Sequence, residues 1–168
     1  MFPDIVRDDV LRLETRRLWL RWPQIADAAA LQALRPYATD DARSFIEASR
    51  AGNACGAHLR LALTFKSGAR ELIGMIGIED EGQPQLCYWL GEAFCGQGLA
   101  SEAVTAMTDA FFQLTTAEKL RAVTPVENAA SIEVLQKAGF GRKKAEQSPN
   151  VLFAMNRAAW RSKAVHAA

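Results

Sequence analysis

The sequence has few cysteines and no long apolar run. Its three cysteines, Cys55, Cys87 and Cys95, are odd in number, and none shows the C-x-x-C spacing of zinc and redox motifs. This argues against a disulfide framework and fits reduced thiols, so we expect a cytoplasmic protein. No stretch approaches the ~18 uninterrupted apolar residues of a membrane span. The start, MFPDIVRDD, lacks the basic and apolar regions of a signal peptide.

The sequence also lacks an excess of charge of either sign. Its 20 Lys and Arg against 19 Asp and Glu give a net charge of +1, which is not the positive excess of a nucleic-acid binder. With 49% hydrophobic and 23% charged residues the composition is that of a globular protein. We expect a single domain over residues 1–168 with its core at about 11–157. We predict no nucleic-acid and no membrane partner, and leave a homodimer open.

Strand and helix patterns alternate along the chain. Period-2 alternation of apolar residues predicts strands at 18–22 and 59–65, and short apolar runs predict further strands at 72–78, 86–90, 120–125 and 151–155. Helices are predicted at 27–34, 40–52, 103–114 and 128–138, and the polar tail at 161–168 is predicted to fray. Short turns join the second, third and fourth strands, which indicates an antiparallel meander. The predicted class is mixed α/β around one sheet.

The stretch FCGQGLASEA places Gly96 and Gly98 directly before the clearest helix. A Walker A loop is excluded, because Gln97 stands where the phosphate-binding lysine is required. A dinucleotide fingerprint is weak, because its third small position is Ser101 and the stretch follows an antiparallel meander. Two interpretations remain. The stretch is either a tight connection that binds nothing, or a pyrophosphate site built from backbone N–H groups at a helix N-terminus.

Five stretches in this order resemble the GNAT N-acetyltransferases, and among them the branch named for ribosomal-protein alanine acetylation. They are LETRRLWLR, LIGMIGI, YWL, GQGLASEA and VENAASIEVLQKAGF, and the resemblance runs from about Leu13 to Met155. It implies a twisted, mainly antiparallel sheet of about seven strands flanked by helices and splayed between the fourth and fifth strands. Acetyl-CoA is expected to lie in that splay as co-substrate, with no metal.

The resemblance also assigns site residues by position. The expected pyrophosphate loop consists of Gly96, Gln97, Gly98, Leu99, Ala100 and Ser101. Leu90 matches the residue whose backbone pairs with pantetheine, and Asn128 matches an asparagine that reaches the pantetheine arm. Ser131 matches a polar residue near the thioester sulfur and is the one catalytic residue assigned, as the group that meets the leaving thiolate. Without the resemblance, Asn128 is an ordinary helix cap and Ser131 a solvated serine.

Three positions depart from the family pattern. Cys95 stands where the loop often starts with another residue type, and Cys87 replaces a common glycine. Gln85 lies where many relatives have a glutamate that helps to deprotonate the amine, so the general base stays unassigned. The function predicted is acetyl transfer from acetyl-CoA to a primary amine, on a protein N-terminus or a small molecule, by direct attack. The alternatives are a catalytically weak acyl-CoA-binding sensor and, far behind, an oxidoreductase.

Three further features have both a functional and a plain structural explanation. His58 could face the acceptor cleft or be structural. The basic residues at 142–144 could reach the 3′-phosphate of CoA or form a solvated turn. The acidic residues at 79–81 could attract a cationic amine or be solvated as well.

Overall fold

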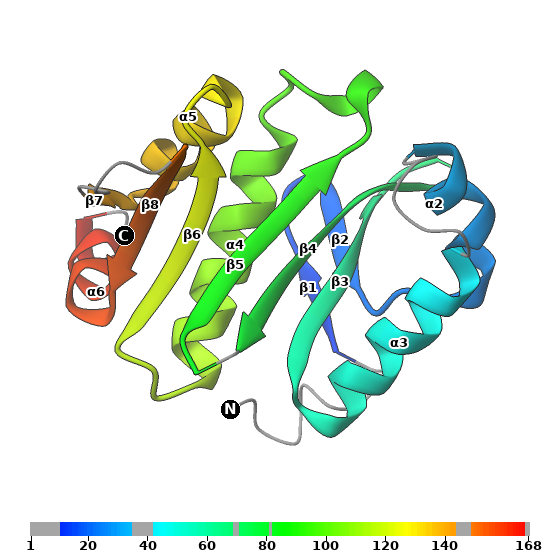
Figure 1. Cartoon of the computed structure of the whole chain (residues 1–168), viewed down its shortest axis with the longest axis horizontal. Coiled ribbons are helices and arrows are strands. Elements are labelled where there is room, and N and C mark those ends of the chain that lie inside the picture. The colour runs from blue at the N-terminus through cyan, green and yellow to red at the C-terminus, as the bar shows by residue number, and fades with distance from the viewer. Residues whose placement is uncertain (1–10, 35–41, 69–70, 81, 144–148, 167–168) are drawn as a thin grey trace.

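Eight strands form one mainly antiparallel sheet in the computed structural model, which describes residues 11–34, 42–68, 71–80, 82–143 and 149–166 (Figure 1). Their order across the sheet is β1-β2-β3-β4-β5-β6-β8-β7. The strands are β1 (Arg12–Glu14), β2 (Leu18–Arg21), β3 (His58–Phe65), β4 (Leu72–Asp80), β5 (Pro84–Leu90), β6 (Lys119–Pro125), β7 (Gly141–Lys143) and β8 (Asn150–Asn156). All neighbours pair antiparallel except β5 and β6, which are parallel. This confirms the predicted mixed α/β class.

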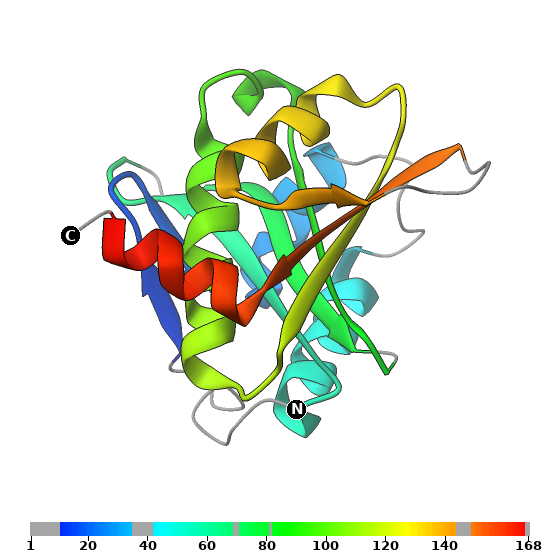
Figure 2. The same cartoon turned by 90° about the vertical axis from the view of Figure 1, so that its left-hand side faces the viewer.

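Helices cover both faces of the sheet. The helices are α2 (Ala28–Leu34), α3 (Ala42–Cys55), α4 (Leu99–Leu114), α5 (Ala129–Ala138) and α6 (Arg157–His166), with short 3-10 turns η1 (Ile25–Asp27) and η2 (Glu92–Phe94). Helices α2 and α3 pack on β3 and β4, while α4 lies on the opposite face, where α5 and α6 pack against it (Figures 1 and 2). Within the described ranges no helix is both long and apolar enough to cross a membrane.

The sheet splays open between β5 and β6. These strands pair only at Gln85 with Arg121 and Leu86 with Ala122, near the start of each strand. Beyond these pairs the two strands diverge (Figure 1). They are the fourth and fifth of the strands expected from the sequence, so the predicted splay is confirmed.

Two buried clusters hold the layers together. The larger lies between the sheet and α4, whose predicted apolar stripe is buried at Ala103, Val104, Met107 and Phe111. The smaller joins α2 and α3 to β3 and β4 around Ile46. Both faces of β3 and β4 are therefore packed, and β4 in turn pairs along β5, which forms one side of the splay.

The prediction from the sequence did not include β1 or β7, and its expectation of a frayed C-terminal tail was wrong. The tail continues α6 as far as His166. Arg157, only 8% exposed, donates to the carbonyls of Phe112, Thr115 and Ala117 at 2.6, 2.7 and 3.0 Å. Trp160 stacks on Phe112 with ring centroids 5.4 Å apart. These contacts with the C-terminal end of α4 stabilise a helix whose own composition is polar.

Candidate active site

The glycine turn leads from η2 into the first turn of α4. Gly96 and Gly98 have φ values of +75° and +73°, a region that favours glycine strongly. A Cβ built on Gly96 would meet no atom within 4 Å, so backbone conformation and not crowding within the protein requires glycine there. Gly98 is the N-cap of α4, and no side chain caps the helix. The first N–H groups of α4 are therefore available to an anion.

A cavity of about 370 Å³ lies against this turn, between the end of β5 and α5. We name it the cofactor cavity. Its lining includes all but one of the predicted cofactor-binding residues, namely Leu90, Gly96, Gly98, Leu99, Ala100, Ser101 and Asn128, together with Ser131. The fold thus gathers residues from two stretches of the chain, 88–101 and 128–137, around one space, as expected for a binding site.

Gln97 is the exception, because it does not line the cofactor cavity. The side-chain amide of Gln97 donates to the backbone carbonyl of Ala93 at 3.0 Å, and the backbone carbonyl of Gln97 accepts from Arg17 Nη1 at 2.9 Å. Arg17 also donates through Nε to Glu102 Oε2 at 2.7 Å, and the Thr15 hydroxyl donates to Glu102 Oε1 at 2.6 Å. The hairpin of β1 and β2 therefore holds both the glycine turn and the first turn of α4.

The backbone of Leu90 faces the splay. Gly91 N donates to Ile73 O at 2.9 Å, which places the N–H of Gly91 on the β4 side. Because N–H groups alternate in direction along a strand, the N–H and C=O of Leu90 point the other way. The pairing with β6 has already ended at Leu86, so this edge of β5 is open to a ligand at the cofactor cavity.

Asn128 and Ser131 lie together at the start of α5. Asn128 Oδ1 accepts from Ser131 N at 3.0 Å, which confirms the predicted helix cap. The carbonyl of Ser131 accepts from the Tyr88 hydroxyl at 3.2 Å. The Ser131 hydroxyl makes no hydrogen bond within the described part of the chain, so the cap and the tyrosine fix the backbone and leave this hydroxyl available.

A second cavity, of about 190 Å³, passes between β5 and β6. We name it the splay cavity. Tyr88, Asn128 and Ser131 line both cavities. Leu86 and Ala122 line it from the core face of the sheet, whereas Cys87 and Val123 line it from the opposite face. The splay cavity is thus lined by residues that belong to both faces of the sheet.

The titratable side chains in the splay cavity are held protonated. Burial, with the nearby Glu79 carboxylate, raises the pKa of the Cys87 thiol to about 11. Burial also raises the pKa of Tyr88, against the opposing effect of its hydrogen bond to Ser131. Neither group is charged near neutral pH, so neither is a ready nucleophile or base there.

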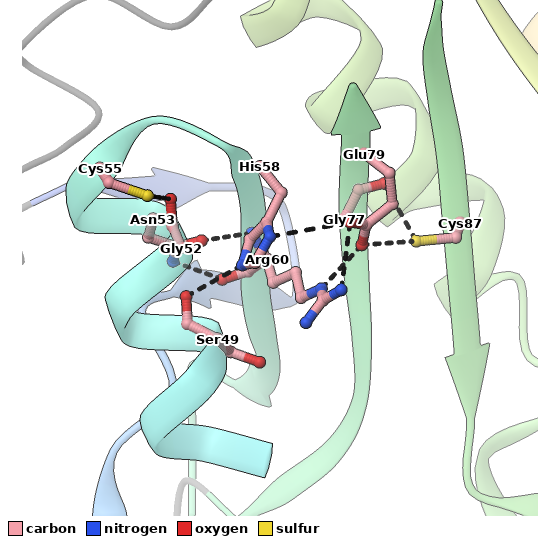
Figure 3. A network of polar contacts seen from close by, with 9 residues as sticks. All are labelled: Ser49, Gly52, Asn53, Cys55, His58, Arg60, Gly77, Glu79 and Cys87. Carbon is pink, nitrogen blue, oxygen red and sulfur yellow. Dashed lines mark hydrogen bonds and ion pairs between the residues drawn. The ribbon is translucent and has the colours of Figure 1, made fainter. Parts of the chain in front are cut away.

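His58 belongs to a polar network beneath α3 (Figure 3). Its Nε2 lies 3.2 Å from the carbonyl of Ser49, and a Cβ on Gly52 would lie 1.9 Å from its ring. Burial and the charge of Arg60 lower the pKa of His58 and outweigh the opposing effects of Ser49 and Glu79. His58 lines neither the cofactor cavity nor the splay cavity, and its packing supports the structural explanation.

The remaining sequence candidates are placed only in part. Arg142 and Lys143 are exposed on β7 and line neither of the two cavities, while Lys144 and Glu81 lie outside the described residues. Among the described residues, no three His, Cys, Asp or Glu side chains lie close enough to hold a metal ion. Sequence reasoning gave no role to Lys137, which lines the cofactor cavity from α5. The sequence signal that could have identified Lys137 is its position in the stretch VENAASIEVLQKAGF, which carries part of the family resemblance.

A family model, described as "Acetyltransferase (GNAT) domain", matches residues 17–141. The chain belongs to the GNAT acetyltransferase family, which confirms the resemblance found in the sequence and supports acetyl transfer from acetyl-CoA. No curated protein matches.

Solved structures agree with this fold. RimJ of Mycobacterium smegmatis, in complex with CoA-disulfide, has a TM-score of 0.75 at 21% identity, covering 99% of this chain and 98% of that one. Ribosomal-protein-S5-alanine acetyltransferase of Vibrio fischeri has a TM-score of 0.74 at 14% identity, covering 89% and 98%. The microcin C7 self-immunity acetyltransferase MccE, in complex with acetyl-CoA and AMP, has a TM-score of 0.72 at 19% identity, covering 84% and 93%. At these identities the likeness concerns the fold.

Proposed function

We propose that this protein transfers the acetyl group of acetyl-CoA to a primary amine by direct attack, without an acyl-enzyme. The observation that carries the proposal is the junction of the two cavities at Tyr88, Asn128 and Ser131. A thioester entering from the cofactor cavity would reach the splay at the point where a second reactant can approach from the opposite face. Two substrates meeting in one space need no covalent carrier.

The residues around the cofactor cavity have distinct proposed roles. Backbone N–H groups of the glycine turn and the first turn of α4 would bind the pyrophosphate, and Asn128 and the backbone of Leu90 would hold the pantetheine arm. The N–H of Leu90 would polarise the thioester carbonyl, whose oxygen gains negative charge during attack. The hydroxyl of Ser131 would donate to the sulfur as the C–S bond breaks and the thiolate leaves.

Proton removal from the amine is proposed to occur through water. An amine with a pKa of about 8 to 10 is mostly protonated at neutral pH and must lose a proton before it attacks. Gln85 has no basic group, and Cys87 and Tyr88 are held protonated. The raised pKa of Cys87 also argues against transfer of the acetyl group to that thiol.

The alternative function is an acyl-CoA sensor, and the presence of Gln85 in place of a carboxylate favours it. An assay of CoA release from acetyl-CoA across a panel of primary amines separates the two functions. Amine-dependent release, with the acetyl group recovered on the amine, supports the enzyme. Tight acetyl-CoA binding without release for any amine supports the sensor.

A further inference from the structure

Four polar residues form a row across the central strands, on the face opposite α4. The register places His58 of β3 opposite Glu79 of β4, Glu79 opposite Gln85 of β5, and Gln85 beside Arg121 of β6. Directly paired residues point to the same face of a sheet. Helices α2 and α3 pack on β3 and β4, and no described helix lies in front of β5 and β6 in Figure 1. The row therefore runs from beneath a helix onto an uncovered part of the sheet.

Arg121 is the one charged member of this row whose side chain has no partner in the described part of the chain. Its neighbours Leu120 and Ala122 are buried in the main core, so the alternation of β6 directs the side chain of Arg121 to the opposite face. It is half-buried, yet it has neither a hydrogen bond nor an ion pair with any described residue. The guanidinium of Arg121 is therefore free to pair with an anionic group of a ligand.

The other charges of the row are already balanced or absent. Glu79 accepts from Arg60 Nε at 2.7 Å and from Arg60 Nη2 at 3.1 Å, so these two groups compensate each other (Figure 3). Gln85 is neutral, and His58 is uncharged near neutral pH because its pKa is lowered, chiefly by burial. The uncovered end of the row consequently carries the single positive charge of Arg121.

Arg121 lies two positions along β6 from a residue that lines the splay cavity. Val123, two residues further along β6 and on the same face, lines that cavity and is 44% exposed. Two residues of a strand span about 6.6 Å, which is within reach of an arginine side chain. If the amine of an acceptor enters the splay cavity beside Val123, the acceptor atoms a few bonds from that amine would lie over Arg121.

We propose that the acceptor carries a carboxylate a few bonds from its amine, and that Arg121 binds this carboxylate as a specificity-determining residue. The inference rests on the proposed function, and it narrows the acceptor from any primary amine to amines with a nearby carboxylate. A guanidinium binds a carboxylate through two parallel hydrogen bonds, which gives orientation as well as affinity. Binding at Arg121 would hold the amine at the splay and leave the acetyl-CoA contacts unchanged.

The test uses matched acceptors and matched variants. One acceptor pair is γ-aminobutyrate and its amide, and the other is a tripeptide with aspartate at its second position and its asparagine counterpart. The variants are Arg121→Gln, Arg121→Lys and the control Lys119→Gln. The control removes a positive charge from the same face of β6, two residues further from the splay cavity than Arg121. Acetyl-CoA Kd and circular dichroism establish that each variant is folded and still binds its co-substrate.

We expect wild-type kcat/KM to be at least tenfold higher for the carboxylate member of one or both pairs than for its neutral partner. Arg121→Gln should abolish this ratio through a higher KM, Arg121→Lys should keep part of it, and Lys119→Gln should leave it intact. The pair that shows the ratio identifies whether the acceptor is a free amino acid or a peptide. Two results would overturn the inference: equal kcat/KM for both members of both pairs, or a ratio that persists in Arg121→Gln. In either case the acetylation of an amine would still support the proposed function. If wild type acetylates no amine at all, the proposed function fails and this inference fails with it.

Discussion

Arg17 Nε lies 2.7 Å from Glu102 Oε2, and this ion pair joins the first hairpin to the first turn of α4. The same arginine donates through Nη1 to the carbonyl of Gln97. A Cβ on Gly98 would lie 3.6 Å from Arg17 Nη2, so the guanidinium lies directly against the turn. Arg17 thereby holds a loop whose glycines would otherwise leave it mobile.

Replacing Glu102 with glutamine should lower stability in a pH-dependent way. Burial alone raises the pKa of Glu102, but hydrogen bonds from Thr15 and Arg17 outweigh it and hold this pKa below its usual value. A carboxylate with a lowered folded-state pKa contributes stability above its unfolded pKa and loses it as the pH falls through the folded one. We expect Glu102→Gln to cost about 1.5–3 kcal/mol at pH 7, and the cost to shrink below about pH 4.

Urea unfolding at pH 7 and pH 3 measures this difference. Glu47→Gln is the control, because Glu47 forms an exposed ion pair with Arg43 at the helix spacing i,i+4, which is worth only about 0.3–0.5 kcal/mol. An equal cost of Glu102→Gln at both pH values would contradict the role of its charge.

Gly98→Val should raise the acetyl-CoA Kd by more than tenfold, or about 1.4 kcal/mol, while the fold persists. The added side chain would strain the φ of +73° and occupy space beside the first N–H groups of α4. Gly68→Val is the matched control, because Gly68 has a φ of +81° and nothing within 4 Å of a built Cβ. Titration calorimetry on both variants compares equal backbone strain at two places. Unchanged affinity in folded Gly98→Val would rule out pyrophosphate binding at this turn.

Ser131→Ala should lower kcat by about 10- to 100-fold, or 1.4 to 2.7 kcal/mol, with less than about a threefold change in acetyl-CoA Kd. The hydroxyl would act only when the thiolate forms, so its loss affects the transition state more than binding. Stability should hold, because the cap uses the backbone N–H of Ser131. Asn128→Ala removes that cap and should instead cost about 1 kcal/mol of stability. Turnover of Ser131→Ala within twofold of wild type would end its proposed role as acid.

The pH profile of kcat/KM should rise toward the pKa of the acceptor amine itself. Cys87 and Tyr88 are protonated through neutral pH, since burial raises the pKa of the first to about 11 and raises that of the second as well. Stopped assays from pH 6 to pH 9 with two amines of different pKa should give profiles that shift with the amine, and Cys87→Ala should leave them unchanged. A common plateau set by an enzyme group well below pH 7 would show that a basic side chain takes the proton.

Local patterns in the sequence predicted much of the fold. The apolar stripe of α4 and the alternation in β3 report burial directly, because helix and strand periods differ. The cap at Asn128 was predictable because it depends on residues three positions apart. The splay and the site residues came from the resemblance to a family, which carries information about packing that composition and period lack.

Features that depend on long-range contacts could not be predicted. Arg17 and Glu102 are 85 positions apart, and neither has a local signal for the other. Helix α6 was missed because its stability comes from the contacts of Arg157 and Trp160 with α4. The position of Arg121 in the row depends on strand register, which only the folded sheet defines.

The most direct test of acetyl transfer in the splay is mass spectrometry of both the amine and the protein after incubation with acetyl-CoA. We predict one acetylated amine for each CoA released, no acetyl group on the protein, and a large loss of product with Ser131→Ala. Recovery of the acetyl group on Cys87, or acetyl-CoA binding with no acetylated amine across the panel, would contradict direct transfer to an amine.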